Sequence, residues 1–229
     1  MPKTIVITGA NRGIGLEFCQ QYLAAGETVF AVLRSSTPSG QLHTLSEKYP
    51  DTLTLITADV TQQEDLHRLH RQLQGQLIDL LINNAGIYGE RLPFGEVNQE
   101  EWMRVLQVNT IAPLMVTQAL VDLLPAGAKI ALISSKMGSI SDNTSGCSYI
   151  YRSSKAAVNA VGKSLSHDLA DKGLSVVICH PGWVRTNMGG PDALIDTQTS
   201  VTGLRKVIEN LNAENSGQFF NYDGSNIDW

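Results

Sequence analysis

Short apolar runs alternate with segments of helical periodicity along almost all of the 229 residues. The runs cover residues 4–8, 28–33, 53–57, 78–82, 129–134, 174–179 and 218–222. The helical segments between them cover about residues 14–25, 40–49, 62–74, 98–124, 151–171 and 197–211. Because most runs stay apolar at successive positions, they are typical of strands that helices cover on both faces.

This alternation predicts an α/β protein with a Rossmann-type, doubly wound parallel sheet of about seven strands and helices on both faces. No linker or change of composition interrupts it, so we expect a single domain spanning residues 1–229. In such sheets, ligands bind beyond the carboxyl ends of the strands, where the winding reverses. We therefore look for functional residues directly after each strand.

Composition and charge argue against several other classes of protein. Seventeen Lys and Arg against 22 Asp and Glu give a net charge of −5, which leaves no broad basic face for nucleic acid. No apolar run approaches the roughly 18 residues of a transmembrane helix, and no signal segment precedes the first strand. Three widely spaced cysteines favour reduced thiols and a cytoplasmic protein, and the histidines lack zinc-site spacing, so we expect no metal.

A glycine-rich turn follows the first predicted strand. Gly9, Gly13 and Gly15 have the spacing G-x-x-x-G-x-G at the start of a helix. Such glycines let the backbone approach a pyrophosphate, and the helix points its free N–H groups and its positive dipole end at the phosphates. A plain connecting turn is the alternative, but the position between strand and helix favours a dinucleotide site.

Two arginines indicate which dinucleotide binds there. Arg34 follows the second predicted strand, at the place where a carboxylate would bind the ribose 2′-hydroxyl of NAD. Arg12 lies within the glycine turn. Two cations and no acid at these places favour a 2′-phosphate, so we expect NADP(H) rather than NAD(H).

Tyr151 and Lys155 are four residues apart, which places them on one face of a helix. A free tyrosine has a pKa of about 10, which makes it a slow acid at neutral pH. A nearby ammonium stabilises the phenolate, and lowering the pKa by ~3 units requires ~4 kcal/mol. We therefore expect Lys155 to lower the pKa of Tyr151, which would donate a proton to a carbonyl oxygen.

Polar side chains follow the fourth and fifth strands as well. Ser135, supported by Ser134, can reach a substrate carbonyl from the end of a strand. The Asn84-Ala85-Gly86 turn suits left-handed backbone and the adenosine side of a cofactor. Pro113 removes the N–H that would bond the Asn109 carbonyl, so this carbonyl is free to hold a water against Lys155.

Together these motifs resemble the short-chain dehydrogenase/reductase family. The matches run in family order from residue 4 to about residue 190, and they include Asp59-Val60, Asn109, the Tyr151/Lys155 pair, Pro181-Gly182 and Thr186. The resemblance implies a catalytic set of Asn109, Ser135, Tyr151 and Lys155. It implies cofactor contacts at Gly9, Asn11, Arg12, Gly13, Ile14, Gly15, Arg34, Asp59, Val60, Asn84, Ala85, Gly86, Tyr151, Lys155, Pro181, Gly182, Val184 and Thr186.

Three segments, residues 134–140, 149–157 and 217–229, are similar to the C-factor group, which itself resembles Sniffer-like carbonyl reductases. One departure concerns the serine, because Ser135 lies 16 residues before Tyr151 whereas the family more often uses about 13. Gly138 occupies the shorter spacing, and Ser139 and Ser141 remain alternatives to Ser135. Tyr149 has no lysine four residues later.

These residues predict an NADPH-dependent carbonyl reductase that acts on an aldehyde, ketone or quinone. An apolar substrate wall is expected from Ile87, Tyr88, Met137, Cys147, Trp183 and Met188. The alternative is a C-factor-like NADP(H)-binding signalling or sensor protein with little turnover. The family resemblance further implies a homodimer or homotetramer, with the two long middle helices in the dimer interface.

Overall fold

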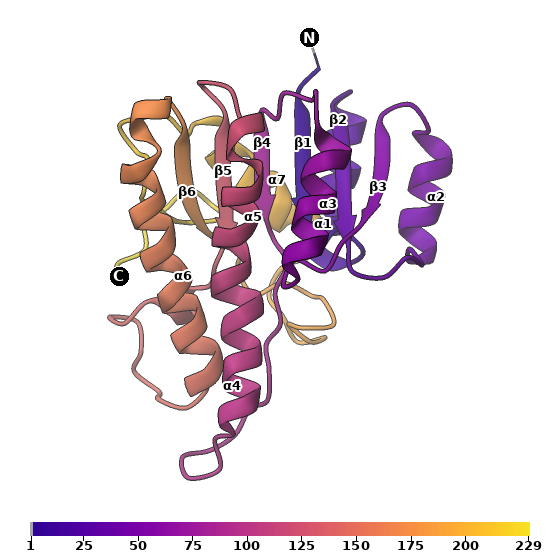
Figure 1. Cartoon of the computed structure of the whole chain (residues 1–229). Helices are drawn as coiled ribbons and strands as arrows, with labels where there is room; N and C mark the ends of the chain where they lie inside the picture. Colours follow the sequence, from indigo (N-terminus) through magenta and orange to yellow (C-terminus); the bar gives the residue numbers. More distant parts are fainter. Residues whose placement is uncertain (1) are drawn as a thin grey trace.

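In the computed structural model, which describes residues 2–229, seven strands form one sheet in the order β3-β2-β1-β4-β5-β6-β7 (Figure 1). Every neighbouring pair is parallel. The strands are β1 (Thr4–Thr8), β2 (Thr28–Leu33), β3 (Leu53–Thr57), β4 (Leu80–Asn83), β5 (Lys129–Ile133), β6 (Ser175–His180) and β7 (Phe219–Asn221). This sheet confirms the predicted fold class.

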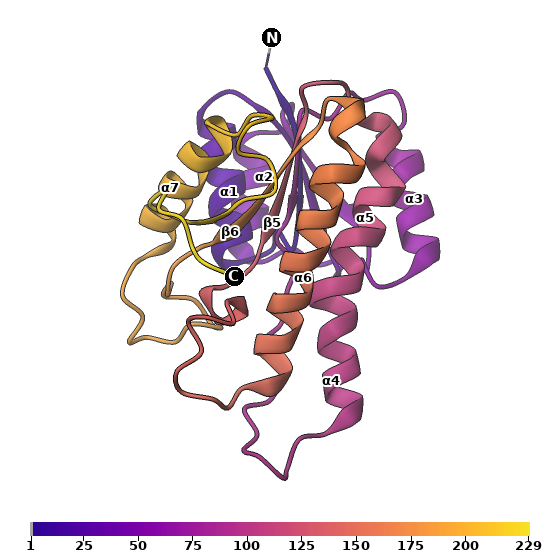
Figure 2. The same ribbon diagram turned by 90° about the vertical axis from the view of Figure 1, so that its left-hand side faces the viewer.

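Helices cover both faces of the sheet (Figure 2). One face carries α1 (Gly13–Ala24), α2 (Gly40–Lys48) and α7 (Thr197–Glu209). The other carries α3 (Gln63–Leu73), α5 (Ala112–Leu120) and α6 (Tyr149–Asp168), and α4 (Gln99–Leu106) lies beyond the edge of the sheet on that side. The winding therefore reverses between β1 and β4, which is where a ligand crevice opens in such folds.

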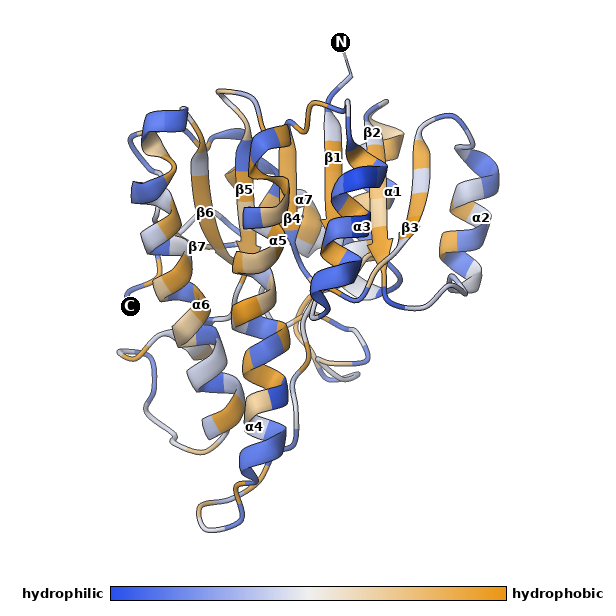
Figure 3. Ribbon diagram, viewed as in Figure 1, coloured by the Kyte–Doolittle hydropathy of each residue, from blue (hydrophilic) through white to orange (hydrophobic). Residues whose placement is uncertain are grey.

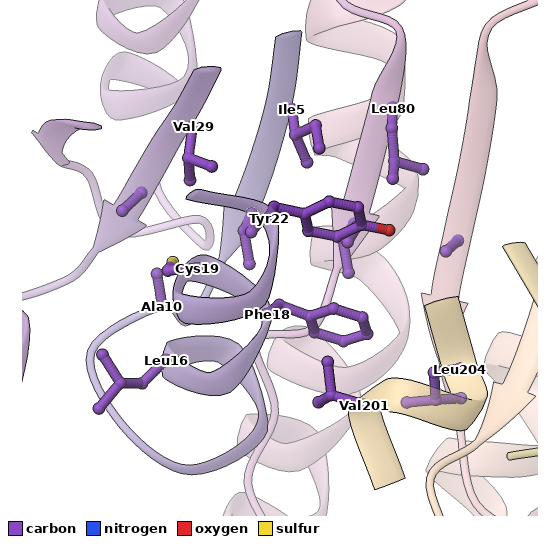
Figure 4. Packing of buried hydrophobic residues seen from close by; sticks show 14 of the residues in the cluster. Ile5, Ala10, Leu16, Phe18, Cys19, Tyr22, Val29, Leu80, Val201 and Leu204 are labelled. Carbon is purple, nitrogen blue, oxygen red and sulfur yellow. The ribbon is translucent and has the colours of Figure 1, made fainter. Parts of the chain in front are cut away.

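Most strand residues are hydrophobic (Figure 3), and each face of the sheet has its own core. In β1, Ile5 and Ile7 pack into the core under α1 and α7, whereas Val6 packs into the core under α3, α5 and α6. Figure 4 shows Ile5 near Phe18 and Tyr22 of α1. This burial explains why the apolar runs do not alternate in polarity.

The helical segment predicted over 98–124 forms one uninterrupted helical stretch, but it is not α-helical throughout. α4 runs into a π-helical turn (Gln107–Ile111), then α5, and then a 3₁₀ turn (Val121–Leu123). Pro113 has no N–H to donate, and the N–H of Ala112 reaches back to the carbonyl of Gln107. The missing N–H of Pro113 thus leads to a π-helical turn before the proline.

Two other predicted boundaries also shift. The strand expected over 78–82 is β4 at Leu80–Asn83, and the helix expected from residue 151 begins at Tyr149. Cys147 and Ser148, just before α6, have φ values of +54° and +50°, left-handed values that are uncommon for residues other than glycine. The left-handed turn at these two residues thus sets the start of α6.

α4 and the first half of α6 extend beyond the carboxyl edge of the sheet, at the bottom of Figure 1. The Trp102 indole donates a hydrogen bond to Ser153 Oγ at 2.8 Å, and the Thr110 hydroxyl donates to the Ser154 carbonyl at 2.9 Å. The two helices are thus joined beside the strand ends. Within residues 2–229, no helix has the length and apolar character that crossing a membrane requires.

Candidate active site

The glycine turn after β1 is packed too tightly for side chains. A Cβ on Gly15 would lie 2.3 Å from the Gly9 carbonyl oxygen, and a Cβ on Gly9 would lie 2.8 Å from Ala85 Cα. Gly9 and Gly13 also have left-handed φ values of +67° and +55°. α1 begins at Gly13 with no capping side chain and no acid in its first turn, so its N–H groups suit a phosphate.

Thr8 connects this turn to the loop after β4. Its hydroxyl accepts hydrogen bonds from the backbone N–H groups of Asn84 and Ala85, both at 3.1 Å. The Asn84 amide donates in return to the carbonyls of Thr8 and Gly9 at 3.0 and 3.1 Å. The two loops at the reversal of winding are thereby fixed to each other.

The predicted adenosine end lies at the carboxyl ends of β1 to β3. Arg12 and Arg34 are exposed, and within residues 2–229 neither forms an ion pair. Asp59 Oδ1 accepts hydrogen bonds from the backbone and the hydroxyl of Thr61. Val60 is partly buried against the core under α3. Two cations with no carboxylate paired to them suit a ribose 2′-phosphate.

Asn11 connects the glycine turn to α2 through a residue that sequence reasoning missed. Its Oδ1 accepts from the backbone N–H of Ser39 at 2.6 Å, and the Ser39 hydroxyl donates to the Asn11 carbonyl at 2.7 Å. The same hydroxyl caps α2 at Leu42. The Ser39 cap just before the helical run was the signal that could have identified this residue.

Residues after β6 form the other end of the crevice. Gly182 has a φ of +83°, and a Cβ on it would lie 2.6 Å from Ile195 Cδ1. The Ser200 hydroxyl donates to the Pro181 carbonyl at 2.5 Å, and buried Val184 pairs with Ile195. This segment returns toward the glycine turn, since Thr186 Cγ2 is 3.2 Å from a Cβ placed on Gly13.

Tyr151 and Lys155 lie on α6 and are almost fully buried, with 8% and 5% of their surface exposed. Lys155 Nζ is 5.7 Å from the centre of the Tyr151 ring and donates to the Ile133 carbonyl at 2.8 Å. Gly86 lies next to Lys155 Nζ, 3.7 Å from the position that its Cβ would take. The lysine is thus held at the end of β5, and two of its three N–H donors remain for a ligand.

The expected acidic tyrosine is not found in the protein alone. Burial raises the pKa of Tyr151 to about 12; the Ser135 hydroxyl opposes this rise and the Tyr88 ring adds to it. Burial also lowers the pKa of Lys155 to about 8. Removal from water is the main cause of both shifts, because the charged form of each group loses its hydration.

Ser135 is the loop serine that faces Tyr151. Its hydroxyl also accepts a hydrogen bond from the backbone N–H of Met137 at 3.2 Å. The hydroxyls of Ser139 and Ser141 contact each other and the Trp229 main-chain oxygen instead. The geometry therefore favours Ser135 over the two alternatives.

Gly138 explains the unusual serine spacing. A Cβ on Gly138 would lie 2.7 Å from the Lys155 carbonyl carbon and 2.9 Å from the Ala156 nitrogen. Both atoms belong to the backbone of α6 and cannot move aside as a flexible side chain would. A serine at the shorter family spacing would therefore displace the helix that carries Tyr151 and Lys155.

Asn109 lies in the π-helical turn and contacts the loop after β4. Its Oδ1 accepts from the Ile87 N–H at 2.9 Å, and its Nδ2 donates to the Ile87 carbonyl at 2.8 Å. Nδ2 also donates to Ser154 Oγ at 3.0 Å. The side chain, rather than the main-chain carbonyl on which sequence reasoning depended, connects Asn109 to α6 and to this loop.

A parallel sheet with a glycine turn at its winding reversal and a buried Tyr–Lys pair beside that turn defines a class, the Rossmann-fold oxidoreductases. The family model described as "short chain dehydrogenase" matches residues 3–194. The chain belongs to the short-chain dehydrogenase/reductase family, which confirms the resemblance stated above.

Three relatives illustrate the range of this similarity. The C-signal protein of Myxococcus xanthus is 45% identical over 154 residues, covering 66% of this chain and 93% of its own. The carbonyl reductase Sniffer of D. melanogaster has a TM-score of 0.94 and 33% identity, with full coverage of both chains. An NADPH-bound carbonyl reductase from chicken fatty liver has a TM-score of 0.92 and 34% identity, covering 100% of this chain and 99% of its own.

Proposed function

We propose that this chain is an NADPH-dependent carbonyl reductase that converts an aldehyde, ketone or quinone to an alcohol. The observation that carries the proposal is the buried Tyr151 phenol, with Ser135 against it and Lys155 one helical turn away. The NADPH-bound chicken carbonyl reductase and the carbonyl reductase Sniffer support it through their similarity over the whole chain. We further propose that residues 1–229 form one domain that binds NADP(H).

The residues present fit such a cofactor. The uncapped start of α1 suits the pyrophosphate, and the exposed cations Arg12 and Arg34 suit the 2′-phosphate. Asp59 and Val60 would hold the adenine, and the loop at 84–86 would line the adenosine side. The backbone at 181–182, with Val184 and Thr186, would hold the nicotinamide, and Lys155 would bind its ribose with its two remaining donors.

When bound, NADPH supplies the hydride that the carbonyl carbon receives. Tyr151 would give its phenolic proton to the carbonyl oxygen, so the C=O double bond becomes a C–O single bond with one new C–H and one new O–H bond. Ser135 donates a hydrogen bond that orients the carbonyl. Lys155 stabilises the phenolate left behind and, through Asn109, connects it to a water from which the proton is regained.

Replacing Tyr151 with phenylalanine tests the proposal. Y151F should abolish NADPH oxidation with a panel of aldehydes, ketones and quinones, because the proton donor is lost, while NADPH binding remains. Tyr149, 40% exposed on the same helix, provides the matched control Y149F, which should keep its activity. A Y151F protein with an undiminished rate would remove Tyr151 from the mechanism.

A second candidate is a signalling or sensor protein that binds NADP(H) with little turnover. The 45% identity to C-signal favours it. The same panel separates the two functions, because tight NADPH binding without oxidation by any carbonyl compound would support the sensor.

We propose a small hydrophobic carbonyl compound as the preferred substrate, since the Tyr88 ring stacks on Tyr151 and Met137 Sδ lies 3.7 Å from the Tyr88 hydroxyl. We also propose a homodimer or homotetramer, with α4, α5 and α6 in the dimer interface. Light scattering during gel filtration tests the assembly.

A further inference from the structure

The ring of Tyr88 stacks on the ring of Tyr151. The two ring centres are 4.3 Å apart and the rings lie within 15° of parallel. On Tyr88 lies Arg91, whose guanidinium carbon is 4.5 Å from the ring centre. Two phenols and a guanidinium therefore form one stack that ends on the proposed proton donor.

The backbone around Tyr88 is fixed on both sides. On one side, the Asn109 amide bonds both the N–H and the carbonyl of Ile87. On the other side, Gly89 has a φ of +76°, and a Cβ there would lie 2.7 Å from Val105 Cγ2. Tyr88 therefore has little freedom to leave the stack by a movement of the loop.

The Tyr88 hydroxyl is held as well. It lies 3.3 Å from Ser148 Oγ and 3.7 Å from Met137 Sδ. Ser148 is one of two non-glycine residues with positive φ in residues 2–229, and it directly precedes α6. Strained backbone of this kind persists only where the surroundings enforce it, and here it accompanies the contact with Tyr88.

We propose that Tyr88 is a positioning residue for Tyr151: with its hydroxyl at Ser148 and the preceding Ile87 backbone bonded to Asn109, it fixes the plane of the Tyr151 ring and covers one of its faces. This inference rests on the proposed function. Water and substrate must then reach the Tyr151 hydroxyl from outside the covered face. Arg91 supports the stack from the outside through the cation–π contact with Tyr88.

The charged and titratable groups around Tyr151 determine what removal of the stack would do. Lys155 lies below it on α6, Tyr88 and Arg91 lie on the loop after β4, and Lys136, near Ser135, is paired with Asp142. Removing the Tyr88 ring opens the phenol to water, which stabilises the phenolate. The pKa of Tyr151 should then fall toward its ordinary value.

Y88L, which removes the ring, is the principal test, with 4-nitrobenzaldehyde as probe substrate. We expect kcat to fall about 2- to 10-fold, the range that corresponds to one aromatic stack, with the NADPH dissociation constant unchanged. The decline of kcat at alkaline pH should begin at lower pH than in the wild type. Y88W should rescue kcat because it keeps a ring in the stack, and Y149L should behave as the wild type.

A second readout does not depend on turnover. The ultraviolet difference titration of tyrosinate between each protein and its Y151F derivative reports the ionisation that depends on the Tyr151 hydroxyl. Its midpoint should move to lower pH in Y88L and return upward in Y88W. A Y88L protein with the wild-type kcat, or with an unmoved tyrosinate midpoint, overturns the inference.

The tyrosinate titration also separates the two proposals. The wild type could reduce no carbonyl compound while the tyrosinate midpoint of Y88L still lies below that of the wild type. This result would contradict the proposed function and would support the role of the stack. Should Y88L fail to fold, Y88W and R91L carry the test. R91L should then lower kcat by less than about 10-fold relative to the wild type, and a Y88W enzyme as slow as Y151F would overturn the inference.

Discussion

Replacing Lys155 with methionine should stabilise the protein at neutral pH while it abolishes turnover. Lys155 is 5% exposed, and burial lowers its pKa from 10.5 to about 8. Because one pH unit corresponds to ~1.4 kcal/mol, keeping this amine charged costs the folded state roughly 3 kcal/mol near neutral pH. Methionine has a similar length and no charge, so K155M removes this cost.

The pH dependence of the stability difference between K155M and the wild type is the sharper part of this prediction. Between about pH 8 and pH 10.5, Lys155 is neutral in the folded state and protonated in the unfolded state, so unfolding takes up a proton. Lys155 therefore makes the free energy of unfolding of the wild type increase as the pH rises, and K155M lacks this increase. The advantage of K155M should shrink by roughly 3 kcal/mol between about pH 7.5 and pH 10.5.

Urea unfolding of both proteins across this pH range measures the difference. Cys19, Cys179, Lys129 and Tyr22 also have pKa values shifted by burial, but they are common to both proteins and cancel. Loss of the Ile133 hydrogen bond lowers the stability of K155M by about 1 kcal/mol at every pH. A stability difference between the two proteins that stays constant with pH would refute the cost assigned to the buried Lys155 charge. NADPH oxidation by K155M would refute the role of Lys155 in turnover.

Three further predictions concern other parts of the molecule. Burial lowers the pKa of His180 from 6.5 to about 4, so unfolding takes up a proton between about pH 4 and pH 6.5. The free energy of unfolding should therefore decrease as the pH is lowered from about 6.5 to 4, and urea unfolding of H180Q should lack this decrease. G138S should cost about 1–3 kcal/mol in urea unfolding and lower kcat, because its side chain meets the α6 backbone, while G40S, at an open position without a left-handed φ, should cost less. R34E should lower kcat/KM for NADPH more than for NADH, and an unchanged ratio would exclude Arg34 from the 2′-phosphate site.

The sequence was sufficient to predict the alternation of helices and strands along the chain and a parallel sheet with helices on both faces, because burial on both sides makes most strands apolar at successive positions. It was also sufficient to find the glycine turn, where the backbone needs left-handed φ values. It did not predict the π-helical turn at Gln107–Ile111, since one extra residue per turn barely changes the apolar periodicity over so short a segment.

The contacts that sequence reasoning missed join residues that are far apart in the chain. Asn109 and Ile87 are 22 residues apart, and Ser39 and Asn11 are 28 apart. Tyr88 was predicted only as part of a substrate wall, and nothing in its neighbours indicates that its ring lies on Tyr151. Such contacts depend on where the loops cross the sheet edge, which periodicity does not determine.

The most instructive error concerns the pKa of Tyr151, which the Tyr-x-x-x-Lys spacing led us to expect below 10. Spacing reports a neighbouring charge but not the loss of water around both groups, and in the protein alone this loss raises the pKa to about 12. A proton donor has to keep its proton until negative charge forms on the carbonyl oxygen, and an alkoxide is still the stronger base. Burial thus keeps Tyr151 protonated at neutral pH, and in the mechanism proposed above Ser135 and Lys155 would stabilise the phenolate as the proton leaves.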